Sequence, residues 1–243
     1  MTIVCKLTLH WVFLQLFTIP PLTAAFDIWN EPGSLAAQRH VVAGVYTEKR
    51  FMIDGWNIHA LSAAIPVGSG VAGLQVLQEG VSPYVQTHFN LMYGLRLGKS
   101  LRMAAGLGYG KGRPEATVGS VWETGKHCRL GLQFRMGGAG LGYGGASLTF
   151  QLGQPAELEL AGGKEARQPL TGRLQLRYRP VDRFLLLGGY AVGPLFPYFG
   201  AGWGMGKWEI GVMGRWHPYL GISPAIMVGW KDRKSDKQNR QVE

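Results

Sequence analysis

The sequence predicts an all-β protein, an antiparallel transmembrane β-barrel of 12 to 14 strands. Hydrophobic residues make up 46% of the chain and charged residues only 16%, against about 25% charged in typical soluble domains. No stretch after the N-terminus holds the roughly 18 consecutive apolar residues of a membrane helix. Apolar residues instead alternate with polar ones along several segments, which is the pattern of a strand with two unlike faces. Composition alone leaves a Gly-rich soluble β-sandwich as the alternative, because the 37 glycines fit either form of β-structure.

The N-terminus predicts export. Lys6 precedes an apolar run over residues 7–17, Pro20 and Pro21 end that run, and small residues follow up to Ala25. This order is typical of a secretory signal peptide, here residues 1–25, with cleavage after Ala25. The remaining chain has Cys128 as its single cysteine. It therefore forms no internal disulfide and offers no cysteine cluster to a metal ion.

Residues 84–98 show the clearest two-residue period. One face of this segment is almost entirely apolar, with the members Val85, Thr87, Phe89, Leu91, Tyr93, Leu95 and Leu97. The other face is polar or small, because strand side chains point alternately to opposite sides. The length also suits a tilted transmembrane strand, which needs about 9–11 residues.

Arginines fall on the polar faces of the alternating segments. An arginine turned toward lipid at the bilayer midplane would cost about 2–4 kcal/mol, so these side chains are expected to face the lumen. The predicted lumen-facing basic residues are Arg96, Arg102, Arg129, Arg135, Arg173, Arg177 and Arg179.

Alternation and turn residues divide the chain into strands. The segments are 40–50, 55–66, 70–79, 84–98, 100–110, 126–136, 140–152, 170–179, 183–193, 197–205, 207–216 and 219–230. They number 12, and a further strand at 157–162 would require 14 because both termini are expected in the periplasm; the sequence slightly favours 12. Tight turns, among them 137–139, are expected on the periplasmic side, and the longest external connection is expected at 111–124.

The barrel is expected to span residues 40–230. Residues 26–39 lack alternation and are either a plug inside the lumen or a periplasmic lead-in. The plug candidates are Asp27, Trp29, Asn30, Glu31 and Pro32. Residues 231–243 are polar and charge-dense, which predicts a disordered periplasmic tail.

The formal net charge is +10. Few acidic residues share the faces of the predicted lumen arginines, so the lumen is expected to carry a positive field. That field would pair with Asp27 and Glu31 or bind an anionic head group, and removing both carboxylates should loosen the N-terminal segment. Expected partners are membrane lipids, lipopolysaccharide, a hydrophobic ligand, or other outer-membrane or secretion proteins, but no nucleic acid, since the chain is exported.

No catalytic constellation emerges from the sequence. The Gly-Lys-Ser run at residues 98–100 lacks the leading glycine of a phosphate-binding loop, because Tyr93 stands at that position. The histidines show no metalloprotease spacing and no serine stands in a nucleophile elbow. We therefore expect no catalytic residues, no metal, no cofactor and no enzyme activity.

Four short motifs resemble the FadL/PorV-like barrels of Gram-negative outer membranes. Residues 30–36 (Asn-Glu-Pro-Gly-Ser-Leu-Ala) are similar to their N-terminal Asn-Pro-Ala-Gly-like motif, and residues 45–51, 178–182 and 219–224 resemble a first strand, a periplasmic turn and a last strand. The resemblance implies an outer-membrane location, 14 strands and an N-terminal hatch. It implies a channel or transporter for hydrophobic or amphipathic molecules, or alternatively a structural or type IX secretion-accessory barrel acting through protein partners. An outer-membrane enzyme is the least favoured reading.

Overall fold

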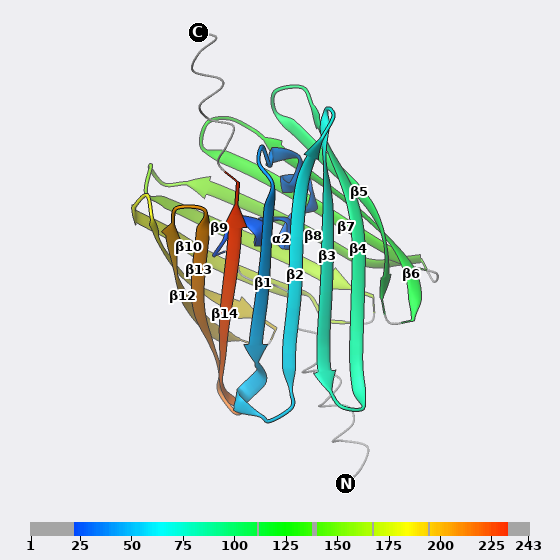
Figure 1. Ribbon diagram of the computed structural model, residues 1–243, viewed down its shortest axis with the longest axis vertical. Coiled ribbons are helices and arrows are strands. Elements are labelled where there is room, and N and C mark those ends of the chain that lie inside the picture. The colour runs from blue at the N-terminus through cyan, green and yellow to red at the C-terminus, as the bar shows by residue number, and fades with distance from the viewer. Residues whose placement is uncertain (1–21, 111, 138–139, 167, 194, 233–243) are drawn as a thin grey trace.

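A computed structural model describes residues 22–110, 112–137, 140–166, 168–193 and 195–232, and these form a closed antiparallel barrel (Figure 1). The barrel strands are β1 (Val42–Lys49), β2 (Asn57–Val67), β3 (Gly70–Val81), β4 (Tyr84–Leu97), β5 (Leu101–Gly110), β6 (Arg113–Glu123), β7 (Cys128–Gly137), β8 (Gly140–Gln151), β9 (Ala156–Glu165), β10 (Thr171–Val181), β11 (Phe184–Val192), β12 (Phe196–Met205), β13 (Trp208–His217) and β14 (Gly221–Lys231). Each strand pairs with its sequence neighbours, and β1 pairs with β14, for example Val45 with Val228, so no sheet edge remains. Closure satisfies the backbone hydrogen bonds that an open edge would expose.

The strand number is 14, so the preference for 12 was wrong. The two additional strands are β6, which occupies most of the connection expected at 111–124, and β9, which occupies the segment left undecided around 157–162. Because β6 is a strand, the chain has no long external connection there.

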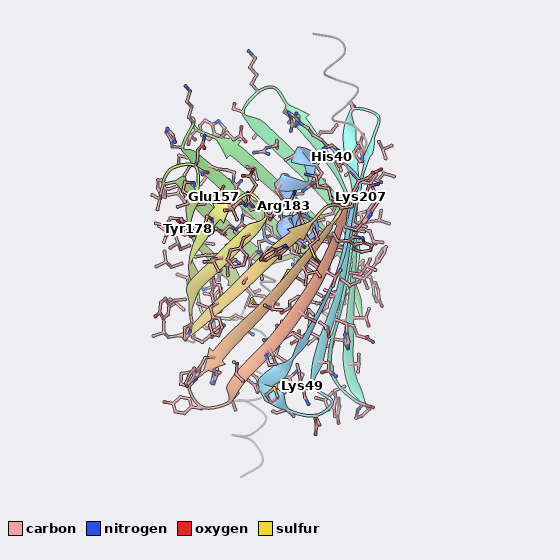
Figure 2. The ribbon with its side chains drawn as sticks, turned by 60° about the vertical axis from the view of Figure 1, so that its left-hand side comes forward. His40, Lys49, Glu157, Tyr178, Arg183 and Lys207 are labelled. Atoms are coloured by element: carbon pink, nitrogen blue, oxygen red, sulfur yellow. The ribbon has the colours of Figure 1, made fainter. Side chains whose placement is uncertain are left out.

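The extra strand also moves one turn to the other end of the barrel. β7 runs in the same direction as β1, so the connection after Gly137 lies at the end where β1 finishes, opposite to the end expected from its length. β9 is the second additional strand, so the turns after it lie again at the ends of the barrel that the sequence predicted. Figure 2 shows the two ends, with Lys49 at one and His40 and Lys207 toward the other.

The two faces of the wall follow the predicted alternation. On β4, Leu91 and Tyr93 are exposed on the outside, while Met92 between them is buried in the lumen. A one-residue shift of register would turn every such side chain to the wrong face, so the apolar exterior fixes the register. In the described part of the chain no helix is long and apolar enough to span a membrane.

The N-terminal segment lies inside the barrel. It forms three short helices, η1 (Ala24–Phe26), α2 (Asp27–Asn30) and η2 (Pro32–Ala37), which Figure 1 shows in blue within the strands. Of the two arrangements expected for residues 26–39, the structure therefore has the lumenal one. Residues 1–21 of the predicted signal peptide and 233–243 of the predicted tail lie outside the described residues. Leu22 and Ala25, which the predicted cleavage after Ala25 would remove, are buried in the lumen.

Candidate functional site: the plugged lumen

The plug, defined here as residues 22–37, combines an apolar core with its own capped turns. Phe26, Ile28 and Leu35 are fully buried between the plug and the wall. Pro32 begins η2, where its missing N–H is not needed for a helical hydrogen bond. The Ser34 amide donates to the Glu31 carbonyl at 2.9 Å, which closes the first turn of η2. The plug thus buries apolar side chains while satisfying much of its own backbone.

Wall side chains bind the backbone of the plug. Ser62 of β2 donates to the Ala25 carbonyl at 2.5 Å, and Gln75 of β3 donates to the Ile28 carbonyl at 3.0 Å. Arg96 of β4 donates through Nε to the Ala36 carbonyl at 3.1 Å. On β13, which β14 and β1 separate from β2, Glu209 accepts a hydrogen bond from the Ala24 amide at 2.8 Å. The plug is therefore attached along its whole length to several strands.

Glycines in the wall make room for η2. A Cβ atom added to Gly94 of β4 would lie 2.9 Å from the backbone nitrogen of Ala36, and one added to Gly119 of β6 would lie 2.8 Å from Cβ of Pro32. Both distances are shorter than real Cβ atoms tolerate, and the first neighbour is backbone. Close approach of two backbones is a recurrent use of glycine in strands.

Substituting Gly94 with valine should therefore displace η2 without unfolding the barrel, because the added side chain meets plug backbone rather than the wall. We expect faster proteolysis within the plug. Gly144→Val is the matched control, since a Cβ at Gly144 meets only the ring of Phe134 at 3.7 Å. Equal proteolysis of the two variants would contradict this packing.

Glu31 is the most closely held charge of the plug. Its carboxylate accepts a hydrogen bond from Ser147 of β8 at 2.5 Å and lies 3.5 Å from Nε of Arg129 on β7. The residue is only 8% exposed. A buried carboxylate requires such partners, because water no longer solvates it.

Asp27 is held more loosely. Its carboxylate lies 3.5 Å from the guanidinium of Arg177 on β10, which also contacts Glu157 of β9 at 3.6 Å. Partial desolvation in the lumen, where the side chain is still 39% exposed, raises the pKa of Asp27 to about 6, and the positive charges of Arg177 and Arg129 oppose that rise. Desolvation therefore outweighs the attraction of the two arginines.

This pKa predicts that acid strengthens docking of the plug. A carboxyl group whose pKa is higher in the docked state binds a proton more tightly there, so docking is strongest below the ordinary value of 3.8 and weakens as pH rises through about 6. Hydroxyl-radical footprinting of the plug should show several-fold better protection at pH 5 than at pH 7.5. Asp27→Asn should abolish that difference. Protection that is flat or falls toward pH 5 in the native chain would contradict the assignment.

Glutamates of the wall balance its arginines, which corrects the expected positive field. Arg173 of β10 forms an ion pair with Glu159 of β9, and Arg102 of β5 forms one with Glu123 of β6. Sequence reasoning missed these partners because β6 and β9 were not assigned as strands. The lumen is a network of opposite charges rather than a positive surface.

The structure places six of the seven predicted arginines in contact with the plug or with inner-wall groups. Arg135 of β7 lies 4.0 Å from Glu115 of β6 and over the ring of Tyr143, at 5.8 Å from its centroid. Arg179 differs, because it is exposed at the end of β10 where the pairing with β11 shifts register. Among the plug candidates, Trp29 and Asn30 line the cavity described below, and Pro32 packs on Gly119. A functional role for any of these residues stays a prediction.

A second charge cluster was missed by the sequence analysis. Glu48 of β1 lies 3.0 Å from Arg50 and 3.7 Å from Arg215 of β13, and it accepts a hydrogen bond from Tyr46. Arg50 begins η3 (Arg50–Met52), whose short loop folds inward, and it lies 3.9 Å from Glu79 of β3. Glu48 and Arg50 are fully buried. This cluster joins β1, β3 and β13 at the end of the barrel where β1 finishes.

The same loop has an unusual backbone. Phe51 and Met52 have φ angles of 50° and 56°, a region that side chains other than glycine rarely adopt. The Phe51 amide donates to Ser223 at 2.9 Å, and its ring packs edge-on against Trp56 at 5.5 Å. Trp56 is itself buried.

A cavity of about 130 Å³ lies between the plug and the wall formed by β7 to β12. Its lining includes Trp29 and Glu31 from the plug and Arg135, Tyr143 and Arg173 from the wall. The cavity adjoins a β-bulge at which Arg135 pairs with Tyr143 but Met136 pairs with Leu141. Bulges commonly re-aim side chains beside functional sites. In the described part of the chain, no group of three or more metal-ligating side chains is present.

Comparisons with known proteins agree with the fold. No family model matches the chain, and no curated protein matches it. Among solved structures, the chain is similar to the Acinetobacter baumannii outer membrane protein Omp33, with a TM-score of 0.60, 5% identity, and coverage of 79% of this chain and 98% of that one. It is also similar to a triple mutant of Rhodopseudomonas blastica porin, with a TM-score of 0.51, 5% identity, and coverage of 79% and 99%. At this identity the likeness shows the fold alone: the chain is a closed barrel of the kind found in porins, and the FadL/PorV-like resemblance stays a prediction.

Proposed function

We propose that this protein is a channel-type barrel of a Gram-negative outer membrane, closed by its own N-terminal plug. The observation that carries the proposal is the pairing of an apolar exterior with a polar lumen occupied by residues 22–37. Neither feature alone would indicate a plugged membrane channel. Together they describe a wall made for lipid and an interior made for water or polar groups.

The exterior supports the membrane location. Large apolar side chains are exposed on strands all around the barrel, for example Leu107 on β5, Leu160 on β9 and Val212 on β13. Soluble monomers rarely expose contiguous apolar patches beyond a few hundred Å². Of the two similar solved structures, one is described as an outer membrane protein and the other as a porin, which supports the same location for this chain.

The attachments of the plug support a gating role. Besides the apolar packing of Phe26, Ile28 and Leu35, they are hydrogen bonds and ion pairs, each of which typically contributes about 0.5–3 kcal/mol. Such contacts can be exchanged for water one after another, whereas a strand of the wall cannot leave without breaking a ladder. The plug can therefore be displaced while the barrel stays closed.

The charged and polar groups within the lining of the cavity favour small amphipathic solutes over purely hydrophobic ones. Arg135, Tyr143 and Arg173 all contribute polar atoms to it. For the alternative of a secretion-accessory scaffold, the longest external connection expected from the sequence is instead strand β6, so the described residues offer no long loop there to a protein partner.

Conductance in planar lipid bilayers tests the proposal. The native chain should conduct weakly, and a variant lacking residues 26–37 should conduct several-fold more at neutral pH, because the lumen then fills with water. The heat-modifiable migration of folded barrels in gels serves as the folding control. Equal conductance of two folded proteins would overturn the proposed gate, and inability of the native chain to insert into the bilayer would overturn the channel.

A further inference from the structure

Two residues that line the cavity beside the plug carry buried hydrogen-bond donors without a partner. Nε and Nη1 of Arg173 are buried and make no hydrogen bond, and Nε1 of the Trp29 indole is in the same condition. Both residues line the cavity, and Arg173 is only 7% exposed. Buried donors without acceptors are unfavourable, so an acceptor placed beside them would bind favourably.

The wall holds Arg173 in a fixed position. Its Nη2 donates to Glu159, and Gln175 donates to the other oxygen of Glu159 at 3.2 Å. Tyr198 in turn donates to Gln175 at 3.2 Å. Glu159 and Gln175 do not line the cavity, and the ion pair engages Nη2, so that Nε and Nη1 make no hydrogen bond. A preformed donor of this kind loses little entropy when a ligand binds.

The remaining charges in the cavity are accounted for. Glu31 is engaged by Ser147 and Arg129, and Glu165 of β9 has partners of its own. Arg135 contributes a second guanidinium. Its side chain is 34% exposed, and it lies as far as 4.0 Å from the carboxylate of Glu115. The groups with spare hydrogen-bonding capacity are thus cationic or neutral donors.

The shape of the cavity limits the size of the ligand. A volume of about 130 Å³ holds on the order of ten water-sized groups. Pro169, Val192 and Phe196 line its apolar part. They lie near the connections between β9 and β10 and between β11 and β12, at the end of the barrel where β1 finishes. The cavity therefore fits a short molecule with one anionic end and a small apolar body.

We propose that this cavity binds small monocarboxylates, with the carboxylate at Arg173 and Trp29 and the apolar body toward Phe196. The inference names a ligand class for the channel proposed above and depends on that proposal only for the route by which the ligand arrives. Arg135 adds a positive charge at the same site, so a neutral analogue of equal shape binds more weakly.

Benzoate and its neutral analogue benzamide, each with a small apolar ring, test this site by tryptophan fluorescence titration and saturation-transfer NMR on the detergent-solubilised full chain. Benzoate should bind saturably and at least about tenfold more tightly than benzamide, because hydrogen bonds to charged groups contribute about 1.5–3 kcal/mol. Arg173→Gln should lose about tenfold in benzoate affinity with little change for benzamide. Trp29→Phe, followed by NMR, should weaken benzoate severalfold while keeping the ring.

Arg102→Gln is the matched control, since Arg102 lies outside the cavity lining and pairs with Glu123. It should leave benzoate affinity unchanged. Equal affinity for benzoate and benzamide, or no binding of benzoate to the folded native chain, would overturn the site. Conductance of the variant lacking residues 26–37 is measured separately, so a failed gate and an absent ligand site give different results.

Discussion

Substituting Arg50 with methionine should lower the free energy of unfolding of the barrel by about 3–5 kcal/mol, the typical cost of removing one partner of a buried ion pair. Arg50 is fully buried, and the variant would leave the carboxylates of Glu48 and Glu79 without its guanidinium. Arg215 compensates only in part, because it lies 3.7 Å from Glu48. Urea unfolding in lipid vesicles, followed by tryptophan fluorescence, measures the change.

Lys49→Met provides the control for that result. Lys49 pairs with Asp54, whose side chain is 98% exposed, and exposed ion pairs typically contribute about 0–1 kcal/mol. The double variant Arg50→Met/Glu48→Leu should recover part of the loss, because it removes a stranded buried charge. If Arg50→Met and Lys49→Met destabilised the barrel equally, the buried cluster would not hold β1, β3 and β13 together.

Substituting Glu31 with alanine is expected to release the plug. The variant removes a hydrogen bond from Ser147 and strands the buried Nε of Arg129, at a cost of about 1.5–3 kcal/mol. The ratio of docked to displaced plug should fall by roughly 10- to 150-fold. Hydrogen exchange of the backbone amides in residues 26–37, read by mass spectrometry, should accelerate accordingly.

Asp27→Asn distinguishes the contribution of Asp27 to docking of the plug from that of Glu31. The sequence led us to expect that Asp27 and Glu31 act together, but burial raises the pKa of Asp27 to about 6, so its charge is not well accommodated at neutral pH. Asp27→Asn should therefore leave exchange unchanged or slow it slightly at pH 7.5. Unaltered exchange in Glu31→Ala would show that Glu31 does not hold the plug.

The strands with clean alternation were predictable from sequence, whereas two strands were not. β4, β5, β7 and β10 place lipid-facing apolar residues opposite polar ones, and a period of two follows directly. In β6 this contrast is lost, because Val121 faces the plug and is fully buried while Ser120 lies on the other face. In β9 the alternation ends at Gly162 and Gly163, where neither face carries a side chain. Local polarity does not report a strand whose inner face packs on apolar plug residues.

The lumen was predictable only in part for the same reason. The arginines could be placed inside because lipid excludes them, but their partners depend on which strands are neighbours. Glu159 pairs with Arg173 only because β9 lies beside β10. The cluster around Arg50 likewise depends on β1 meeting β14 and β13 at the barrel closure, which the sequence does not encode within any one segment.

Disulfide trapping of the plug against β6 tests the central claim that residues 22–37 occupy the lumen. A Cβ at Gly119 lies 2.8 Å from Cβ of Pro32, slightly closer than the roughly 3.5–4.5 Å of a disulfide, so a small shift allows a bond. In a Cys128→Ser background, Pro32→Cys/Gly119→Cys should give a joined pair of tryptic peptides after mild oxidation in membranes. Pro32→Cys with Gly188→Cys should not, because a Cβ at Gly188 meets nothing within 4 Å on the outer face. Peptides that fail to join in the first variant, or that join equally in both, would contradict a plugged barrel.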